Sequence, residues 1–473
     1  MRLKSSLLKE HSGIIIILFL AVFLRMNWHH SYPPGWDPSV YILMGKYIFS
    51  HGQIGFIEPY RPLAWPLILG FGFKLGFSSI SWGAMLEFLF GIGNIVLIYL
   101  IGFKVFDKKT GLVAALFLSF SPTHVCYGNS LYADIPAAFF GLLSVLLFIE
   151  AKIFLSGTLV ILAFFTRFIY LLPAVILAGL VLLHPENNLN AKKLPPVAAF
   201  IGGVSFIAAM FLLFNLVLYN NILQPFIDAQ KCYGQYHFKW SQGIIDCWQQ
   251  LFAIESWFFV FVPVGIVALI QKPIYRSRIL IALIGTVLFI WIGKYPTDIP
   301  RYLTASIPYL YLLAAYGFFI VYQTFIKTRL KYLLLLILLF SLGLQIWRIH
   351  QIQFPKNKLN VIQQYVVDHS DAIKDAWVSD PSAVVFSNLK IQELMYYPIV
   401  DVQKISDLNK HLSRAGYIFY DDRALPCRPV NDPTCNEAKA KLLERIKIDF
   451  ELALPEEKSS FTNFGIFKRR VHQ

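Results

Sequence analysis

The sequence predicts an α-helical protein that crosses a membrane many times and carries a small α/β domain at its C-terminal end. The composition is 56% hydrophobic and 15% charged, with a mean hydropathy of +0.56, which is too apolar for a soluble globular protein. Apolar stretches of about 20 residues, the length that crosses a bilayer, recur up to residue 350. From residue 351 onward, short strands alternate with helices.

The membrane part is expected to contain about eleven transmembrane helices. The apolar block 155–183 is too long for one straight span and is interrupted by Thr166-Arg167, so it predicts two short helices that turn near Arg167. The other predicted spans are 13–29, 82–104, 111–127, 135–153, 196–218, 254–271, 279–293, 303–325 and 332–349.

The basic residues indicate how these spans are oriented. With eleven spans, the basic clusters between them all fall on the N-terminal side, which the positive-inside rule makes cytoplasmic. They are Arg2, Lys4, Lys9, Lys104, Lys108, Lys109, Lys152, Lys192, Lys193, Lys272, Arg276, Arg278, Lys327, Arg329 and Lys331. We therefore expect a multi-pass protein of the cell membrane with a cytoplasmic N-terminus and an extracytoplasmic C-terminal domain.

The N-terminus and the net charge each allow a second interpretation. Residues 1–24 resemble a signal peptide, but no small-residue cleavage site follows, which predicts an uncleaved first span. The net charge of +14 could indicate a nucleic-acid partner. The basic residues form short clusters between apolar runs, however, and this pattern is typical of cytoplasmic loops.

Two domains are predicted: a transmembrane domain over 1–350 and a soluble extracytoplasmic α/β domain over 351–473. The first outer loop covers about 30–80. Its second piece, IEPYRPLAWPLILGFGFKLGF, is apolar but short and rich in Pro and Gly, which predicts helices that lie in the membrane interface or dip in and out of it. The tail predicts a largely parallel sheet with strands in AWVSD, YYPIVDV, YIFYDD, DFELALPE and NFGIFKRR. No Gly-rich phosphate loop opens its helices, which argues against nucleotide binding there.

Four of the five cysteines form two candidate disulfide pairs on the predicted outer side. Cys427 and Cys435 lie close together in the tail, and Cys232 and Cys247 share the second outer loop. Pairs on an oxidising side of a membrane are candidates for disulfides, and free thiols are the alternative.

Asp37 and Asp134 stand where a predicted outer loop enters a helix. Each is close to a proline, in Asp37-Pro38 and in Asp134-Ile135-Pro136, so each could simply cap its helix. The functional alternative is a catalytic carboxylate: Asp37 as a general base on an acceptor hydroxyl, and Asp134 as a residue that binds substrate or a metal.

Other polar residues of the predicted outer side could complete a site. Glu58 and Arg61 could form a local ion pair, or could shape an acceptor pocket together with Tyr41, which lies one helical turn after Asp37. They could also pair with a catalytic carboxylate.

Arginine binds phosphate through two parallel hydrogen bonds, so Arg167 and Arg301, with Tyr302 and Lys294, predict a phosphate site. The alternative for each arginine is an interfacial side chain that reaches toward water.

In their order and sidedness, these elements resemble the GT-C integral-membrane glycosyltransferases, and most closely the group of protein O-mannosyltransferases and lipid A aminoarabinose transferases. The resemblance covers about residues 10–325. It rests on Asp37, Arg61-Pro62-Leu63, Tyr132-Ala133-Asp134-Ile135-Pro136, Thr166-Arg167-Phe168 and Arg301-Tyr302. The sequence departs from the group in having Asp37-Pro38 where the mannosyltransferases have an Asp-Glu pair, and in lacking a histidine near Arg61.

The resemblance implies inverting transfer of a hexose or pentose from a polyprenyl-phosphate donor to a lipid, glycan or protein acceptor at the outer membrane face. Asp37 would be the base, Arg301 and Arg167 would hold the donor phosphate, and Asp134 would order the first loop. A divalent cation, Mg²⁺ or Mn²⁺, could be a cofactor held by Asp37 and Asp134. The alternatives are a non-catalytic carrier or flippase for a lipid-linked glycan, and a membrane scaffold that displays the C-terminal domain.

Overall fold

The structure is a computed structural model that divides into two compact units, and each is described by itself. It describes residues 11–27, 34–183, 195–233, 240–271, 276–292, 300–351, 360–429, 432–454 and 464–470. The first unit comprises 1–30, 84–214 and 238–354, and the second comprises 31–83, 215–237 and 355–473.

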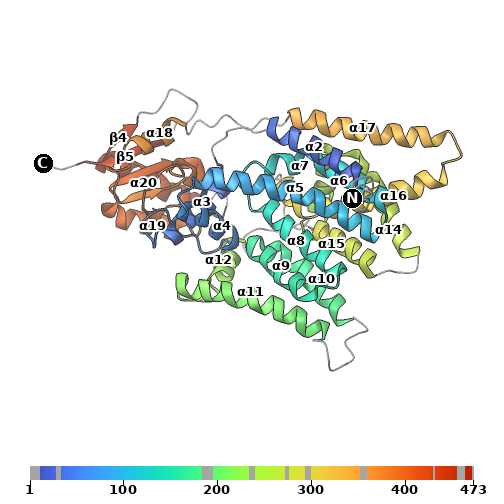
Figure 1. Cartoon of the computed structure of the whole chain (residues 1–473). Helices are drawn as coiled ribbons and strands as arrows, with labels where there is room; N and C mark the ends of the chain where they lie inside the picture. The colour runs from blue at the N-terminus through green and yellow to red at the C-terminus, as the bar shows by residue number, and fades with distance from the viewer. Residues whose placement is uncertain are drawn as a thin grey trace. The chain divides into compact units, whose positions relative to one another are not determined.

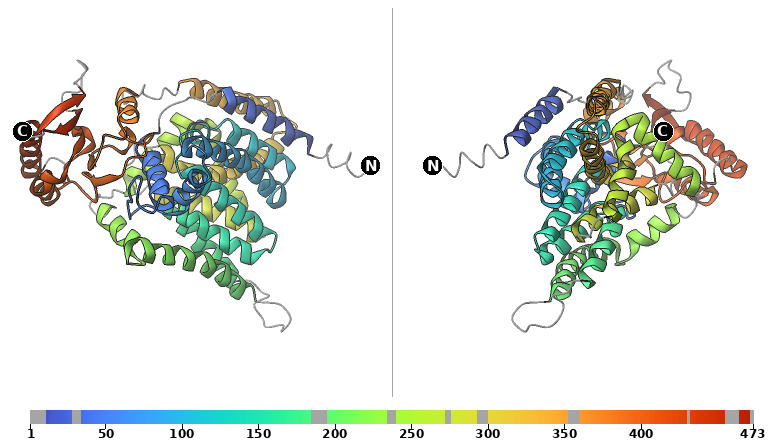
Figure 2. Two further views of the ribbon diagram at one scale, coloured as in Figure 1. Left: turned by 60° about the vertical axis from the view of Figure 1, so that its left-hand side comes forward. Right: turned by 90° about the vertical axis from the view of Figure 1, so that its right-hand side faces the viewer.

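The first unit is a bundle of helices, in which α8, α9 and α10 run alongside one another (Figures 1 and 2). A helix lies within each apolar stretch that the sequence predicted to span. Its helices are α2 (Ser12–Asn27), α5 (Ser79–Val105), α6 (Lys108–Ser119), α7 (Pro122–Tyr127), α8 (Asp134–Ile149), α9 (Ile153–Thr166), α10 (Leu171–Leu182), α11 (Pro196–Tyr219), α13 (Trp240–Gln250), α14 (Val262–Gln271), α15 (Arg276–Ile292), α16 (Ile307–Thr324) and α17 (Leu330–Gln351). Residues 79–83 of α5 and 215–219 of α11 belong to the second unit.

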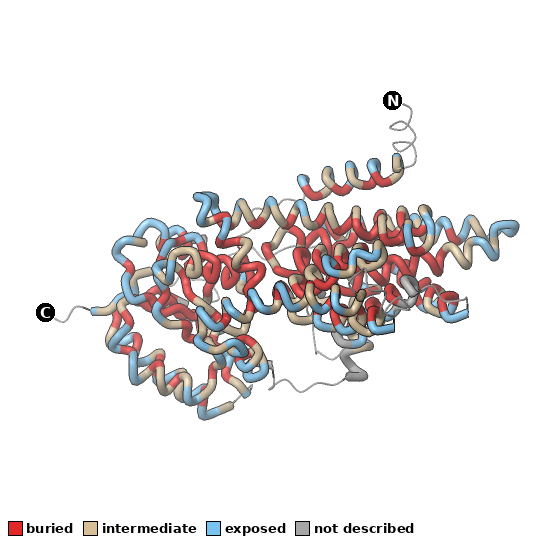
Figure 3. Tube along the Cα trace, turned by 60° about the horizontal axis from the view of Figure 1, so that its bottom comes forward, coloured by how far each residue is buried: buried red, intermediate tan, exposed pale blue. Residues whose placement is uncertain are grey.

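Among the described residues, four of these helices are long and apolar enough to cross a membrane: α5, α11, α16 and α17. They differ in how much of their surface other helices cover. In α16, 67% of the most apolar stretch is buried, against 22% in both α11 and α17. Figure 3 colours the trace by burial and shows both buried and exposed residues along the helices. We infer that α16 lies inside the bundle, and that α11 and α17 present apolar side chains to lipid. The total of eleven spans stays a prediction.

The predicted break in the block 155–183 is confirmed. Helix α9 ends at Thr166, and Arg167 has an extended backbone with φ −150° and ψ 120°. A short 3₁₀ turn, Phe168–Tyr170, then leads into α10. Arg167 therefore lies at the junction of two short helices.

The second unit contains a five-stranded sheet in the order β2-β1-β3-β5-β4. Strands β1, β2 and β3 are parallel to one another, whereas β5 is antiparallel to both β3 and β4. The strands are β1 (Ala376–Val378), β2 (Ile391–Leu394), β3 (Tyr417–Asp421), β4 (Phe450–Leu454) and β5 (Phe464–Arg469); the helices are α3 (Trp36–Phe49), α4 (Ala64–Lys74), α12 (Gln224–Tyr233), α18 (Asn360–Asp368), α19 (Val402–His411) and α20 (Pro433–Asp449).

Two expectations about this sheet were wrong. It is mixed, not largely parallel, because β4 and β5 join it as an antiparallel hairpin. The segment YYPIVDV is not a strand; the strand lies upstream at β2. Pro398 has no N–H to donate to a ladder, and the side chain of Asp401 accepts a hydrogen bond from the Lys404 N–H, which starts α19 instead.

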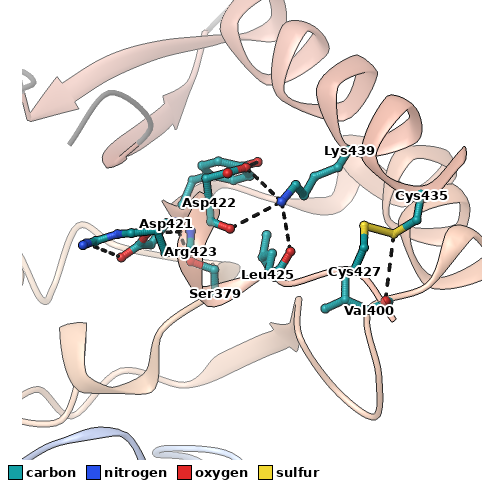
Figure 4. Close-up of polar contacts among 10 residues, drawn as sticks. Ser379, Val400, Asp421, Asp422, Arg423, Leu425, Cys427, Cys435 and Lys439 are labelled. Carbon is teal, nitrogen blue, oxygen red and sulfur yellow. Dashed lines mark hydrogen bonds and ion pairs between the residues drawn. A yellow bond between two sulfur atoms is a disulfide. The ribbon is translucent and has the colours of Figure 1, made fainter. Parts of the chain in front are cut away.

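Polar contacts tie β3 to α20 at the carboxyl end of β3 (Figure 4). Asp421 pairs with Arg423, and Lys439 of α20 contacts the Asp422 carboxylate at 3.2 Å and donates to the carbonyl of Leu425. Cys427 and Cys435 are joined by a disulfide, which confirms one of the two predicted pairings. The bond connects the loop after β3 to the first turn of α20.

The segment 31–83 packs against the C-terminal residues of the second unit. Gly55 makes two backbone hydrogen bonds at the start of β2: its N–H donates to the Leu389 carbonyl at 2.7 Å, and its carbonyl accepts from the Ile391 N–H at 3.0 Å. Lys46 of α3 donates to the carbonyls of Val385 and Ser387. The predicted interfacial loop thus belongs to the same compact unit as the tail.

Replacing Gly55 with alanine should strongly destabilise the second unit. Gly55 has φ +76°, and a Cβ atom there would lie 2.2 Å from the Leu43 carbonyl oxygen. The left-handed backbone alone costs about 1–3 kcal/mol for a residue with a side chain, and the clash adds to it. Gly76 is a matched control, because it has φ +87° but a Cβ atom there would have nothing within 4 Å. Thermal unfolding in detergent should show a larger loss for Gly55→Ala than for Gly76→Ala, and equal losses would contradict this account.

Candidate functional site

Neither Asp37 nor Asp134 caps its helix, so the structural interpretation of both residues was wrong. Helix α3 starts at Trp36 with Gly35 as its N-cap, and no side chain caps it. Helix α8 starts at Asp134 itself, with Ala133 as its N-cap and again no side-chain cap. Each carboxylate instead contacts an arginine from another part of its own unit.

In the second unit, Asp37, Arg61 and Glu58 form a buried charged cluster. The Arg61 guanidinium donates to Asp37 Oδ1 at 2.7 Å, and its Nε lies 3.5 Å from Glu58 Oε2. Asp37 and Arg61 are each 7% exposed, and Glu58 is fully buried. Both arrangements considered for Arg61, a local pair with Glu58 and a pair with the candidate base, are present together.

Glu58 is the more deeply buried of the two acids in this cluster. Burial raises the pKa of Glu58 above that of an exposed glutamic acid, and the nearby Arg61 charge opposes this rise. The ring of Tyr41 lies 5.7 Å from the Arg61 guanidinium carbon. Functional sites use two buried acids beside one arginine to hold one carboxylate ready for proton transfer.

Aromatic residues from three segments of the second unit surround this cluster. Tyr396, which follows β2, packs edge-on against Trp36 at 4.5 Å, and its neighbour Tyr397 stacks on Tyr60 at 5.7 Å. The Tyr397 hydroxyl donates to Asp228 of α12 at 2.7 Å. Trp36 precedes Asp37 in sequence, and Tyr60 precedes Arg61, so each of these two tyrosines packs against a direct neighbour of a charged residue.

Sequence reasoning missed this aromatic contribution because Tyr396 and Tyr397 lay in a segment predicted to be a strand. The one available signal was the adjacent tyrosine pair followed by Pro398, a combination that disfavours a central strand.

In the first unit, Asp134, Arg167 and Arg301 come together with two tyrosines. Arg167 contacts Asp134 Oδ1 at 2.8 Å, and its guanidinium carbon lies 5.7 Å from the ring centre of Tyr302. The guanidinium carbon of Arg301 lies 4.8 Å from the ring of Tyr132 and 5.1 Å from that of Tyr302. One cluster of two guanidinium groups and one carboxylate therefore comes from the start of α8, the end of α9 and the turn before α16.

Glu87 of α5 positions the loop that leads into α8. Its Oε2 accepts a hydrogen bond from the Leu131 N–H at 2.7 Å, and Leu131 has φ +62°. This contact fixes the backbone directly before Tyr132 and Asp134. The partner of Glu87 is therefore the backbone of Leu131. In the sequence, Glu87 is notable only as an acid within a predicted span.

Two other predicted residues need separate mention. Lys294 lies outside the described residues. Cys247 is a free, buried thiol, so the candidate pairing of Cys247 with Cys232 was wrong.

The candidate metal ligands do not fit a cation site. The carboxylates of Asp37 and Asp134 each contact an arginine, at 2.7 and 2.8 Å respectively, so each already has a cationic partner. Within the ranges that the structure describes, no group of three or more His, Cys, Asp or Glu side chains could hold a metal ion. We therefore derive no chemical step through a metal.

Comparison with known proteins gives matches in structure but not in sequence. No protein-family model matches the chain, and no curated protein matches its sequence. The crystal structure of ArnT from Cupriavidus metallidurans bound to undecaprenyl phosphate is similar, with a TM-score of 0.65 and 11% identity, covering 97% of this chain and 98% of ArnT.

Two other solved structures extend the likeness. The oligosaccharyltransferase AglB from Archaeoglobus fulgidus, in complex with an inhibitory peptide and a dolichol-phosphate, has a TM-score of 0.54 at 10% identity and covers 88% of this chain and 70% of AglB. The arabinofuranosyltransferase AftD from Mycobacteria has a TM-score of 0.53 at 12% identity and covers 97% of this chain and 41% of AftD. All three are GT-C membrane glycosyltransferases.

The chain has the GT-C fold. The match to ArnT extends over nearly the whole length of both chains, so the likeness includes the C-terminal part as well as the helices. At about one residue in ten identical, the GT-C likeness concerns the architecture alone.

Proposed function

We propose that the protein is a glycosyltransferase that moves a sugar from a polyprenyl-phosphate donor to an acceptor hydroxyl at the outer face of the membrane, with inversion. The observation that carries this proposal is that Asp37 and Asp134, two acids of the predicted outer side, are each buried and paired with an arginine. The similar structure of ArnT, which was crystallised with undecaprenyl phosphate, supports a polyprenyl-phosphate donor.

In the proposed reaction, the acceptor oxygen attacks C1 of the sugar and the bond between C1 and the phosphate oxygen breaks. The acceptor proton passes to Asp37, and the polyprenyl phosphate departs with the bonding electron pair. Arg61 orients the Asp37 carboxylate through their contact of 2.7 Å. A positioned general base contributes about 10²–10⁴-fold to such a step.

Arg301 and Arg167 are the proposed partners of the donor phosphate. Negative charge builds up on that phosphate as it leaves, and guanidinium groups stabilise it without needing to gain or lose a proton. Tyr302 lies beside both guanidiniums, and Asp134 holds Arg167 in place at 2.8 Å. In this proposal Asp134 positions Arg167 and does not itself accept a proton.

The reaction class can be tested directly with purified full-length protein in detergent. The assay supplies radiolabelled polyprenyl-phosphate sugars and a membrane extract as the source of acceptors. Wild type should transfer label from the lipid-linked sugars and not from nucleotide sugars. Transfer from nucleotide sugars alone, or binding of the lipid-linked donor with no turnover, would contradict the proposal, and the second result would favour a carrier.

The proposed orientation places the C-terminal residues outside the cell and the start of α6 inside. Glu437 and Lys109 are both exposed and suit a labelling test. A cysteine at Glu437 should react with a membrane-impermeant maleimide in intact cells, whereas one at Lys109 should react only after permeabilisation. The reverse pattern would invert the topology.

A further inference from the structure

The second unit contains a pocket that neither charged cluster uses. Its volume is about 320 Å³, and it lies between α3, the start of α5 and the residues before β2. Its polar lining residues include Lys46, Ser78, Ser79 and Asn388, and its aromatic ones are Phe73, Phe77 and Phe386.

Lys46 brings a positive charge to this pocket without a carboxylate to balance it. It is 7% exposed, and in the described part of the chain its ammonium group donates to the carbonyls of Val385 and Ser387, at 3.1 and 2.8 Å, and joins no ion pair. An ammonium group has three N–H donors, so one is left for a ligand. Burial lowers the pKa of Lys46 to about 8, which leaves the group mostly charged at neutral pH.

The start of α5 supplies further donors for an anion. Helix α5 begins at Ser79 and runs for 27 residues, and the N–H groups of a helix's first turn point outward at its positive end. The Ser79 side chain is 4% exposed and lines the pocket, and its hydroxyl has no hydrogen-bond partner among the described residues. The Ser78 hydroxyl accepts from the Ser81 N–H at 3.5 Å, so one N–H of this first turn is already used. A buried lysine, an unpaired buried hydroxyl and the remaining N–H groups of a helix N-terminus are groups suited to holding an anion.

The entrance of the pocket is apolar. Phe77 is 54% exposed and Phe386 is 43% exposed, and Leu75, next to the lining residue Gly76, is 54% exposed. Large apolar side chains exposed beside an anion site suit a ligand that has both a negative head and hydrocarbon chains.

We propose that this pocket binds the phosphate headgroup of an anionic phospholipid. Lys46, the Ser79 hydroxyl and the first turn of α5 hold the phosphate, and Phe77 and Phe386 contact the acyl chains. The site is separate from Asp37 and does not depend on the proposed glycosyl transfer. Its occupation would anchor α3 and the start of α5 to the membrane surface.

The test is a binding titration of the full-length protein in detergent with three probes: dihexanoyl phosphatidic acid, dihexanoyl phosphatidylcholine and inorganic phosphate. Phosphatidic acid should bind about tenfold or more tightly than the other two, because only it offers both a strongly anionic phosphate and acyl chains. Equal binding of inorganic phosphate would overturn the assignment to a lipid, and equal binding of phosphatidylcholine would overturn the anion site.

Single substitutions test whether phosphatidic acid binds in this pocket. Lys46→Met keeps the length of the side chain without its charge and should weaken phosphatidic acid binding about tenfold, and Ser79→Ala about threefold. Lys74→Met, which removes an exposed lysine from nearby α4, should bind like wild type. Arg301→Ala should also keep this affinity, which separates the pocket from the donor site. If Lys46→Met fails to fold, Ser79→Ala decides, and unchanged affinity in that variant would overturn the proposal.

Discussion

Asp37→Asn should reduce sugar transfer by about 10²–10⁴-fold, the range of a lost general base. Asparagine keeps the size of the side chain and can still accept a hydrogen bond from Arg61, but it cannot take up the acceptor proton. The rate should therefore fall while donor binding changes little. Single-turnover transfer and a separate donor-binding titration on the purified variant would distinguish these two effects.

Asp371→Asn is the matched control, because Asp371 is an exposed acid of the same unit that is far from Asp37 in sequence and has no place in the proposed site. It should transfer sugar like wild type. Thermal unfolding of Asp37→Asn checks that the loss of charge beside buried Arg61 has not unfolded the second unit. A folded Asp37→Asn protein with the wild-type rate would exclude Asp37 as the base.

Arg301→Ala should reduce transfer by about 10²–10³-fold, as loss of one preorganised group that stabilises a departing anion does. The charge on the phosphate grows as the sugar bond breaks, so we expect kcat to fall more than KM for the donor rises. Arg301→Lys should recover part of the rate, because it restores the charge but not the planar group with paired donors.

Arg329→Ala provides the comparison at the opposite end of α16. Arg329 is exposed and follows that helix, so its loss should leave transfer unchanged. If Arg301→Ala and Arg329→Ala were equally active, Arg301 would be an interfacial side chain that only stacks on Tyr132 and Tyr302, which is the alternative that the sequence left open.

The membrane part of the fold could be predicted because its signal is local. Apolar runs, the interruption at Arg167 and the prolines beside Asp37 and Asp134 each report on their own neighbourhood. The C-terminal sheet was predicted less well, since a strand's partner and direction depend on residues far away. Strand β2 has only four residues and a polar middle, so nothing in IQEL distinguishes it from a loop, whereas the more apolar YYPIVDV suggested a strand.

The same reasoning applies to the candidate site. Residue type and predicted sidedness were enough to nominate Asp37, Arg61, Asp134, Arg167 and Arg301. Their pairing was not predictable, because Arg61 could have contacted Glu58 alone and Arg167 could have faced water. The approach of Tyr396 to Trp36 joins residues 360 positions apart, and no periodicity or motif carries information over that separation.

The contacts of Lys46 and Gly55 have a consequence for the order of events during synthesis. Lys46 and Ser387, whose carbonyl it contacts, are 341 residues apart in the sequence. A ribosome that adds about 5–20 residues per second therefore reaches Ser387 roughly tens of seconds after Lys46. Until then α3 and the Gly55 turn exist without the residues that complete their hydrogen bonds. The second unit can therefore mature only once the chain is almost finished, and a nascent protein should acquire its complete Asp37 surroundings at the end of translation, after its apolar helices have entered the membrane.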